Sequence, residues 1–181
     1  MVQYRTSEEI LQKNEELKIE HTKSVSWAAK SKEVQKFIEK NWPKDSTILD
    51  IGCGGGHFLK FLKENGYQNI YGFDIDNYVV FDDIKNKISI GDLNFEKIDF
   101  EKEKFDFITA FQVMEHLENP FHFERECVRL LRPGGVLILS IPSGKSIWSR
   151  FSYLMNNNIT GYDLINNHIT FLTRDVFEKH F

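Results

Sequence analysis

The chain has 181 residues, and 23 Lys and Arg stand against 27 Asp and Glu, which is a formal net charge of −4 at pH 7. Hydrophobic residues make up 41% of the chain and include 16 Phe and 3 Trp, which excludes an intrinsically disordered protein and suits one globular domain. The acidic balance argues against a broad basic surface, so nucleic acid is not the expected partner.

The sequence contains no signal for export or membrane insertion. Residues 1–20 are polar and charged and lack the apolar core of a signal peptide. Purely apolar stretches such as 136–139 have the length of a strand and are too short to span a bilayer. Cys53 and Cys127 do not suggest a disulfide framework, which favours a reducing compartment. We therefore expect a cytoplasmic protein that does not enter the membrane.

Residues 1–44 are expected to form a helical segment. Residues 6–9 read Thr-Ser-Glu-Glu, which has the form of a capping box, and apolar residues follow at helical spacing. A second helical pattern runs from about residue 26 to Pro43, with one apolar face made of Trp27, Val34, Phe37 and Ile38. The pattern leaves open whether this segment packs on the domain or acts as a lid over a ligand.

From residue 47 onward, short apolar strands alternate with helical patterns. Strands are expected at 47–51, 69–73, 88–90, 105–111 and 136–141. Helices are expected after the first strand up to Gly66, at 77–84, and from Pro120 to Leu131. Parallel strands joined by helices form a sheet with helices on both faces. The expected fold class is therefore α/β, with a Rossmann-like, doubly wound and mostly parallel sheet in a domain over 45–181.

A glycine-rich loop with the sequence Asp-Ile-Gly-Cys-Gly-Gly-Gly spans residues 50–56, directly after the first strand. Glycines allow a sharp turn and a close approach to a ligand, and the helix that follows attracts hydrogen-bond acceptors to its N-terminus. A dinucleotide fingerprint would need glycine at position 57 or 59, where His57 and Leu59 stand. A P-loop over residues 144–146 fails because position 139 is Leu139. Both of these nucleotide-binding loops are excluded.

The remaining pattern, acidic-x-Gly-x-Gly-x-Gly, resembles the class I S-adenosylmethionine-dependent methyltransferases. Three further words occur in the order of that family: Gly-Phe-Asp at 72–74, Gly-Asp-Leu at 91–93, and Met-Glu-His-Leu at 114–117. The resemblance covers roughly residues 45–142, and it includes methyltransferases of small metabolites and of ubiquinone biosynthesis. Any single word is weak, whereas the ordered set is specific.

The resemblance implies that S-adenosylmethionine is the cofactor. In the family the glycine loop curls around the methionine part, and the acid at the position of Asp50 supports the loop and the amino group of the cofactor. The acid at Asp74 would take both ribose hydroxyls, which suits a carboxylate with two acceptor oxygens. Asp92 would accept from the adenine amino group. The residues expected to bind the cofactor are Asp50, Gly52, Cys53, Gly54, Gly56, Asp74, Ile75, Asp92, Leu93 and Gln112.

Catalytic residues are expected near the ends of the fourth and fifth strands. A general base helps methyl transfer to a hydroxyl, and His116 and His168 are the candidates. His116 has the alternative role of ordering its loop, and His168 that of lining the acceptor pocket. In the metal-assisted small-RNA 3′-end methyltransferases, a His like His168 joins a Glu-x-x-Glu-His run. Gln112 replaces the first Glu of that run, and an amide is a poorer ligand for a hard dication, so no metal is expected.

Residues 143–170 are expected to form a substrate lid, because this long segment after the fifth strand mixes aromatic and Asn residues without a clear period. A helix follows near Thr173, and the chain ends inside it, so the C-terminal strand hairpin usual in the family is expected to be missing. The predicted function is methylation of a small-molecule hydroxyl, such as that of a sugar or quinone precursor. A cofactor-binding module without turnover and a metal-assisted RNA-end methyltransferase are the alternatives.

Overall fold

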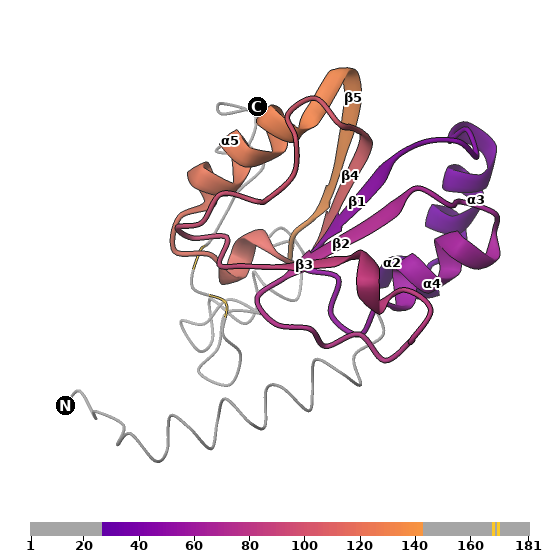
Figure 1. The fold of residues 1–181 in the computed structure, drawn as a ribbon, viewed down its shortest axis with the longest axis horizontal. Coiled ribbons are helices and arrows are strands. Elements are labelled where there is room, and N and C mark those ends of the chain that lie inside the picture. The colour runs from indigo at the N-terminus through magenta and orange to yellow at the C-terminus, as the bar shows by residue number, and fades with distance from the viewer. Residues whose placement is uncertain (1–26, 143–167, 169, 171–181) are drawn as a thin grey trace, which may run out of the picture.

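Five parallel strands form one sheet in the order β3-β2-β1-β4-β5 (Figure 1). They are β1 (Ile48–Ile51), β2 (Ile70–Asp74), β3 (Ile88–Ile90), β4 (Phe105–Phe111) and β5 (Leu131–Ser140). The structure, a computed structural model, describes residues 27–142 together with residues 168 and 170. The order confirms the predicted α/β, Rossmann-like fold. It places the switch point between β1 and β4, where sheets of this type bind ligands at the carboxyl ends of the strands.

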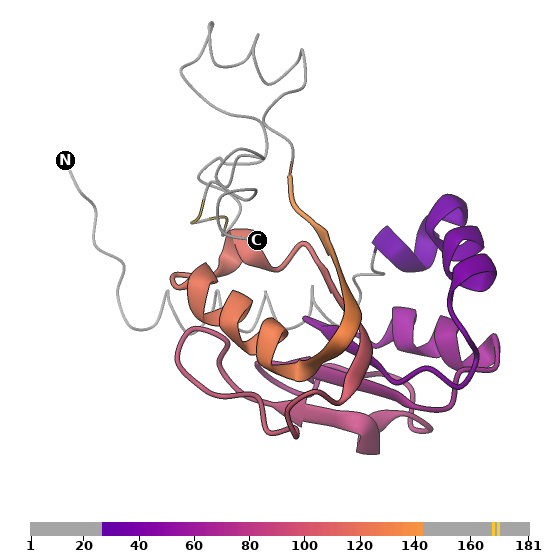
Figure 2. The same ribbon diagram turned by 90° about the horizontal axis from the view of Figure 1, so that it is seen from above.

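Helices cover both faces of this sheet (Figure 2). The helices α2 (Trp27–Lys30), α3 (Lys32–Asn41) and α4 (His57–Glu64) lie on one face, and α5 (Pro120–Leu130) lies on the other. Two short 3-10 helices, η1 (Lys85–Lys87) and η2 (Met114–His116), belong to the connections. Asn119 caps α5 as predicted, because its Oδ1 accepts from the backbone N–H of His122 at 3.2 Å, with Pro120 in the first position.

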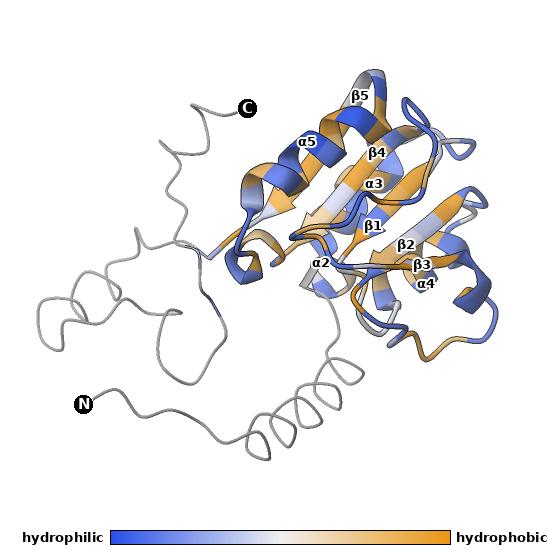
Figure 3. Cartoon of the chain, turned by 60° about the vertical axis from the view of Figure 1, so that its left-hand side comes forward, coloured by the Kyte–Doolittle hydropathy of each residue, from blue (hydrophilic) through white to orange (hydrophobic). Residues whose placement is uncertain are grey.

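The hydrophobic core is divided by the sheet into two layers. The α5-side core joins Leu49 and Ile51 of β1 to residues of α5, namely Phe123, Cys127 and Leu130. The α4-side core joins Ile48 to residues of α3 and α4, namely Ile38, Phe58, Leu59 and Leu62. Figure 3 shows the same division, with apolar strands in the centre and polar outer faces on the helices. A short strand that is buried on both faces carries apolar side chains on both faces. The strand could be predicted from the short continuous apolar run that results.

The helical pattern predicted from about residue 26 to Pro43 forms two helices, α2 and α3, rather than one. Ser31 separates them and caps α3, since its Oγ accepts from the backbone N–H of Val34 at 3.4 Å. Ile38 is fully buried, and Trp42 stacks on Phe107 of β4 with 4.1 Å between ring centroids. Phe37 was expected on the same apolar face but is 53% exposed. Residues 27–42 therefore pack on the domain, and a lid role for the segment 1–44 stays a prediction.

The helix predicted at 77–84 is wrong. Asn77 forms an Asx turn instead, in which its Oδ1 accepts from the backbone N–H of Val79 at 3.3 Å, and such turns compete with helix formation. Val79 and Ile84 are buried against the glycine loop, where a Cβ on Gly56 would lie 2.9 Å and 3.0 Å from their side chains. Covering the loop with two apolar side chains requires an irregular chain path there.

Strand β5 begins five residues before the predicted start at 136. Leu131 already pairs with Phe105, and Val136 pairs with Phe107, so residues 132–135 bulge out between the two pairs. Within the described residues, no helix has the length and hydropathy needed to cross a membrane. The predicted lid, apart from His168 and Thr170, lies outside the described residues, as do the helix near Thr173 and the helix after the capping box at 6–9.

Candidate functional site

The glycine loop lies between the carboxyl ends of β1 and β4, at the switch point of the sheet (Figure 1). The backbone N–H groups of Gly52 and Cys53 donate to the carbonyl oxygen of Phe73 at 2.8 Å and 3.3 Å, which ties the loop to β2. Gly52 has a φ of 70°, and a Cβ there would lie 2.5 Å from Cγ2 of Val113. The loop therefore needs glycine at position 52 for both its conformation and its contact with the segment after β4.

Two of the expected cofactor residues turn their side chains into the core. Cys53 is 5% exposed, and its Sγ lies where a Cβ on Gly72 would be 2.9 Å away. Burial raises the pKa of the Cys53 thiol well above its usual range, and the charges of Asp50 and Asp74 raise it further. Leu93 is 8% exposed and belongs to the α5-side core. Only the backbone groups of Cys53 and Leu93 are thus available to a ligand.

Asp74 ends β2 and is held from two sides by the backbone. Its Oδ2 accepts from the N–H of Gly54 at 2.7 Å, and its Oδ1 accepts from the N–H of Ile75 at 2.8 Å. A carboxylate has two oxygens, each with two lone pairs, which is the acceptor set that suits a pair of neighbouring hydroxyl groups. The side chain of Ile75 is 61% exposed directly beside it. A fixed carboxylate next to an exposed apolar group suits a nucleoside, which has a ribose and a flat base.

Asp50 is a buried residue in the middle of the sheet. It is 3% exposed, and the hydroxyl of Thr109 in β4 donates to its Oδ1 at 2.7 Å. Burial, together with the charge of Asp74, raises the pKa of Asp50 to about 7, although the hydrogen bond from Thr109 acts in the opposite direction. Asp50 therefore lies inside the sheet at the start of the glycine loop, and it joins β1 to β4 through the hydrogen bond from Thr109.

Asp92 and Gln112 lie in the turns that follow β3 and β4. Oδ1 of Asp92 accepts from the backbone N–H of Asn94 at 2.8 Å and from its side-chain amide at 3.0 Å. Gln112 is exposed and has a φ of 59°, which is rare for a residue with a side chain. Its N–H donates to both the carbonyl and the hydroxyl oxygen of Ser140, at 3.0 Å and 3.1 Å. Strained residues of this kind concentrate at functional sites.

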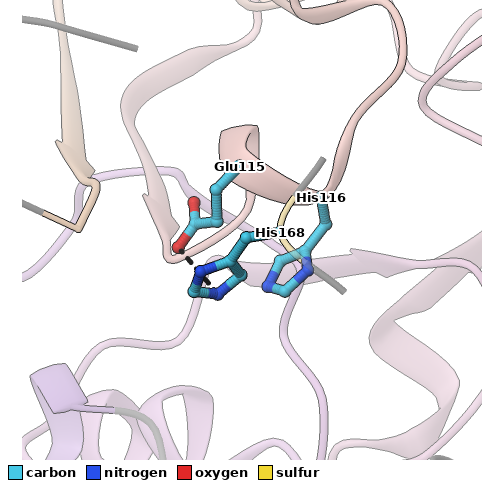
Figure 4. Close-up of side chains that lie close together, drawn as sticks. All are labelled: Glu115, His116 and His168. Carbon is cyan, nitrogen blue, oxygen red and sulfur yellow. Dashed lines mark ion pairs between the residues drawn. The ribbon is translucent and has the colours of Figure 1, made fainter. Parts of the chain in front are cut away.

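Glu115, His116 and His168 form a cluster at the start of the segment that leads to α5 (Figure 4). The His168 ring lies between the other two side chains, with its Nε2 4.0 Å from Oε1 of Glu115 and its centroid 4.7 Å from that of His116. The cluster is held together by Thr170, whose N–H donates to the carbonyl oxygen of Glu115 at 3.0 Å and whose hydroxyl donates to the carbonyl of Leu117. The two predicted catalytic histidines are thus neighbours in space.

Glu115 belongs to this cluster but was not among the predicted catalytic residues, which were His116 and His168. It is 0% exposed, and neither carboxylate oxygen accepts a hydrogen bond from any residue that the structure describes. Burial raises its pKa to about 7. One donor atom from each of the three residues lies within 4.8 Å of the others, a grouping that could hold a metal ion. The Glu-His dipeptide at 115–116 was the sequence signal, but its burial and its contact with His168 were not readable.

Replacing Gly52 by Ala should weaken ligand binding to the loop by about tenfold, since a Cβ there meets Val113 and the residue must keep a positive φ. The double variant Gly52→Ala with Val113→Ala should recover part of the affinity, because the contact is relieved while the backbone strain remains. Calorimetric titration of both variants with S-adenosylhomocysteine checks this. Equal affinity of the two variants would mean that the contact with Val113 has no effect on binding.

The chain is similar to known proteins over most of its length. A family model described as a methyltransferase domain matches residues 24–181. The ubiquinone biosynthesis O-methyltransferase of Coxiella burnetii is 31% identical over 113 residues, which are 58% of this chain and 47% of that protein. The protein of the same name from Colwellia psychrerythraea is 30% identical over 118 residues, which are 60% of this chain and 46% of that protein. The chain thus spans about half the length of these curated relatives.

Solved structures agree on the fold. A SAM dependent methyltransferase from Archaeoglobus fulgidus superposes with a TM-score of 0.58 at 20% identity, covering 81% of this chain and 64% of that one. The trans-methyltransferase CalH, solved in complex with SAH, superposes with a TM-score of 0.56 at 19% identity, covering 81% of this chain and 45% of that one. At these identities the likeness is one of fold.

Proposed function

Because the chain belongs to the family of S-adenosylmethionine-dependent methyltransferase domains, we propose that it transfers a methyl group from this cofactor to a hydroxyl of a small molecule. The observation that carries the proposal is the pairing of the glycine loop with Asp74 at the carboxyl ends of β1 and β2, beside the switch point of the sheet. The loop donates its Gly54 N–H to that carboxylate at 2.7 Å, so the two parts of the cofactor site are already locked together. The ribose and the methionine part of one ligand would meet at this point.

The other expected cofactor residues surround this pair. Asp92 would accept from the adenine amino group, since one of its oxygens is held by Asn94, and Ile75 would pack on the adenine with its exposed side chain. The backbone of Leu93 and the exposed Gln112 complete the set. Asp50, which accepts a hydrogen bond from Thr109 of β4, would support the start of the glycine loop from inside the sheet. These residues fit the cofactor because hydrogen-bond acceptors, an apolar side chain and a tight backbone turn follow the consecutive strands β3, β2, β1 and β4 at the same edge of the sheet.

The histidine cluster provides the acceptor side of the proposed reaction. When bound, S-adenosylmethionine supplies an electrophilic methyl group on a sulfonium. His168 would take the proton of the acceptor hydroxyl on its imidazole, with the buried carboxylate of Glu115 at 4.0 Å to stabilise the imidazolium. His116 orders the same side of the site through its ring contact with His168. Val113 connects this segment to Gly52 of the cofactor loop.

A small metabolite is the acceptor that the chain supports best. The net charge of −4 disfavours a polyanionic partner, and the similarity to ubiquinone biosynthesis O-methyltransferases supports an acceptor with a hydroxyl group, such as a quinone precursor or a sugar. We place the reaction in the cytoplasm, since Cys53 and Cys127 are both buried free thiols. A cofactor-binding module without turnover is the alternative, and product formation in a screen of hydroxylated metabolites would exclude it.

A metal-assisted methyltransferase acting on an RNA 3′ end is the second candidate. The observation in its favour is the carboxylate of Glu115, which is fully buried without a hydrogen bond from a described residue and which faces two imidazoles. A carboxylate and two histidines suit a divalent transition-metal ion and would orient an acceptor hydroxyl. Gln112, which stands where a fourth ligand, a second carboxylate, would be needed for a harder cation, weakens this candidate.

The two candidates differ in their response to chelation. With a metabolite acceptor and no metal, His168→Ala should lower kcat by roughly a hundredfold, as expected for loss of a general base, while EDTA has no effect. Asp82→Ala, which changes a side chain that is 93% exposed and pairs with Lys85, is the control and should keep the activity. Activity on RNA ends that EDTA abolishes and Mn²⁺ restores would instead establish the metal-assisted function. Full activity of His168→Ala would contradict both candidates.

A further inference from the structure

Two loops that belong to different parts of the proposed site are joined through Asn94, whose side chain bonds to both and whose backbone carbonyl accepts from the side-chain amide of Asn119 at 3.4 Å. The loop 91–96 follows β3 and carries Asp92, while the segment 112–119 follows β4 and carries the histidine cluster. β3 and β4 are separated in the sheet by β2 and β1. Asn94 nevertheless connects the two loops, because both run over the α5 side of the sheet, where Leu93 and Leu117 belong to the same core.

The side-chain amide of Asn94 makes contacts in both directions. Its Oδ1 accepts from the backbone N–H groups of Glu118 and Asn119, at 2.8 Å and 3.1 Å. Its Nδ2 donates to Oδ1 of Asp92 at 3.0 Å, and its own backbone N–H donates to the same oxygen at 2.8 Å. The amide thus uses a donor toward one loop and an acceptor toward the other. A side-chain amide offers a donor and an acceptor on one planar group, which suits this double contact.

The polarity of these bonds has a consequence for Asp92. Two N–H groups of Asn94 converge on Oδ1 of Asp92 and so fix the orientation of its carboxylate. A second link, between Nε2 of His122 and the carbonyl oxygen of Glu96 at 2.9 Å, holds the loop against α5. The loop therefore keeps its place when Asn94 is changed, and the orientation of Asp92 is what Asn94 adds.

We propose that Asn94 is a positioning residue that orients Asp92 for the adenine amino group and, through the same amide, holds the segment that carries Glu115 and His116. This inference rests on the proposed function, because it assigns the adenine to Asp92. It means that the adenine end of the cofactor and the acceptor side of the site share one hydrogen-bonded connection.

Two variants separate the two directions of the amide. Asn94→Asp keeps an oxygen for the N–H groups of Glu118 and Asn119, but it places a carboxylate opposite Oδ1 of Asp92, where a donor is needed. Asn94→Ala removes both contacts. Asn65→Ala is the matched control, since the Asn65 amide is also half-buried and donates to the carbonyl oxygen of Phe61 at 2.9 Å, at the end of α4.

The first measurement is the ratio of affinities for S-adenosylhomocysteine and S-inosylhomocysteine, which lacks the adenine amino group. The wild-type chain should prefer the adenosyl compound by about tenfold, and both Asn94 variants should reduce this preference roughly three- to tenfold, the value of one hydrogen bond. A residue with only a structural role would weaken both ligands equally and leave the ratio unchanged.

The second measurement is amide hydrogen exchange at Glu118 and Asn119 in the ligand-free chain. Exchange at both amides should become faster in Asn94→Ala and stay slow in Asn94→Asp, and Asn65→Ala should match the wild type. An unchanged ratio in Asn94→Asp, or unchanged exchange in Asn94→Ala, would overturn the role of Asn94 alone. Failure of the wild-type chain to bind S-adenosylhomocysteine would contradict the proposed function and, with it, this inference.

Discussion

Asp74→Ala should weaken binding of S-adenosylhomocysteine by about 3 kcal/mol, or roughly 150-fold in Kd, when both chains are titrated by calorimetry. The carboxylate would lose two charge-assisted bonds to the ribose, and the loop would lose the anchor that now accepts from Gly54 and Ile75 at 2.7 Å and 2.8 Å. The affinity of Asp74→Asn should lie between those of the wild type and Asp74→Ala. The variant retains one acceptor oxygen but turns an amide N–H toward one of the two backbone donors.

Asp82→Ala is the matched control for this experiment. Its side chain is 93% exposed and, among the described residues, pairs with the side chain of Lys85, so the substitution removes one negative charge without touching the glycine loop. Its affinity should stay within about twofold of the wild type. NAD serves as the ligand control and should not bind. If Asp74→Ala and the wild type bound S-adenosylhomocysteine with equal affinity, Asp74 would not be the residue that binds the ribose. The observation that carries the proposed function would then be contradicted.

Asp50→Asn should stabilise the ligand-free chain at pH 8 by an amount of the order of 4 kcal/mol, and by little at pH 4. The pKa of Asp50 is about 7 in the folded chain against 3.8 for the free side chain, and each pKa unit corresponds to about 1.4 kcal/mol. The folded state therefore binds this proton more tightly than the unfolded state. As the pH rises from about 4 to about 7, the stability provided by the proton is lost.

The groups around Asp50 determine this behaviour. Thr109 donates to its Oδ1 at 2.7 Å, while Asp74 and Cys53 are the titratable groups that influence or face it. An asparagine at position 50 can accept the same hydroxyl proton without a charge, so the pH-dependent part disappears in the variant. Urea unfolding of both chains at several pH values between 4 and 8 measures the difference in free energy directly.

Asp83→Asn is the control with the opposite sign. Hydrogen bonds and charges of Lys60 and Lys63 lower the pKa of Asp83, so its contribution is present at neutral pH and is lost as the pH falls. That variant should be slightly less stable than wild type at pH 8 and equal to it in acid. A stability difference between Asp50→Asn and wild type that does not change with pH would show that Asp50 is ionised throughout.

Local patterns were sufficient for most of the strands. The limits of β3 and β4 are those predicted, β1 begins one residue later than predicted, and β2 is shifted by one residue at each end. A buried parallel strand is a short apolar run between polar turns, so its limits are written in consecutive residues. The segment 77–84 shows where this fails, because the helix predicted there is absent and Val79 and Ile84 are placed by their contacts with Gly56.

The family and its cofactor loop could be recognised from the chain alone, because an acid and glycines at given spacing describe one backbone turn after one strand. The side-chain partners in the site could not. The contacts of Asp50 with Thr109, of Glu115 with His168 and of Asn94 with Glu118 join segments that are far apart in the chain. Their distances depend on the order in which the strands lie in the sheet and on how the segments after them pack. No local spacing encodes that arrangement. Burial follows from the same packing, which is why the raised pKa values of Asp50 and Glu115 emerged only with the folded chain.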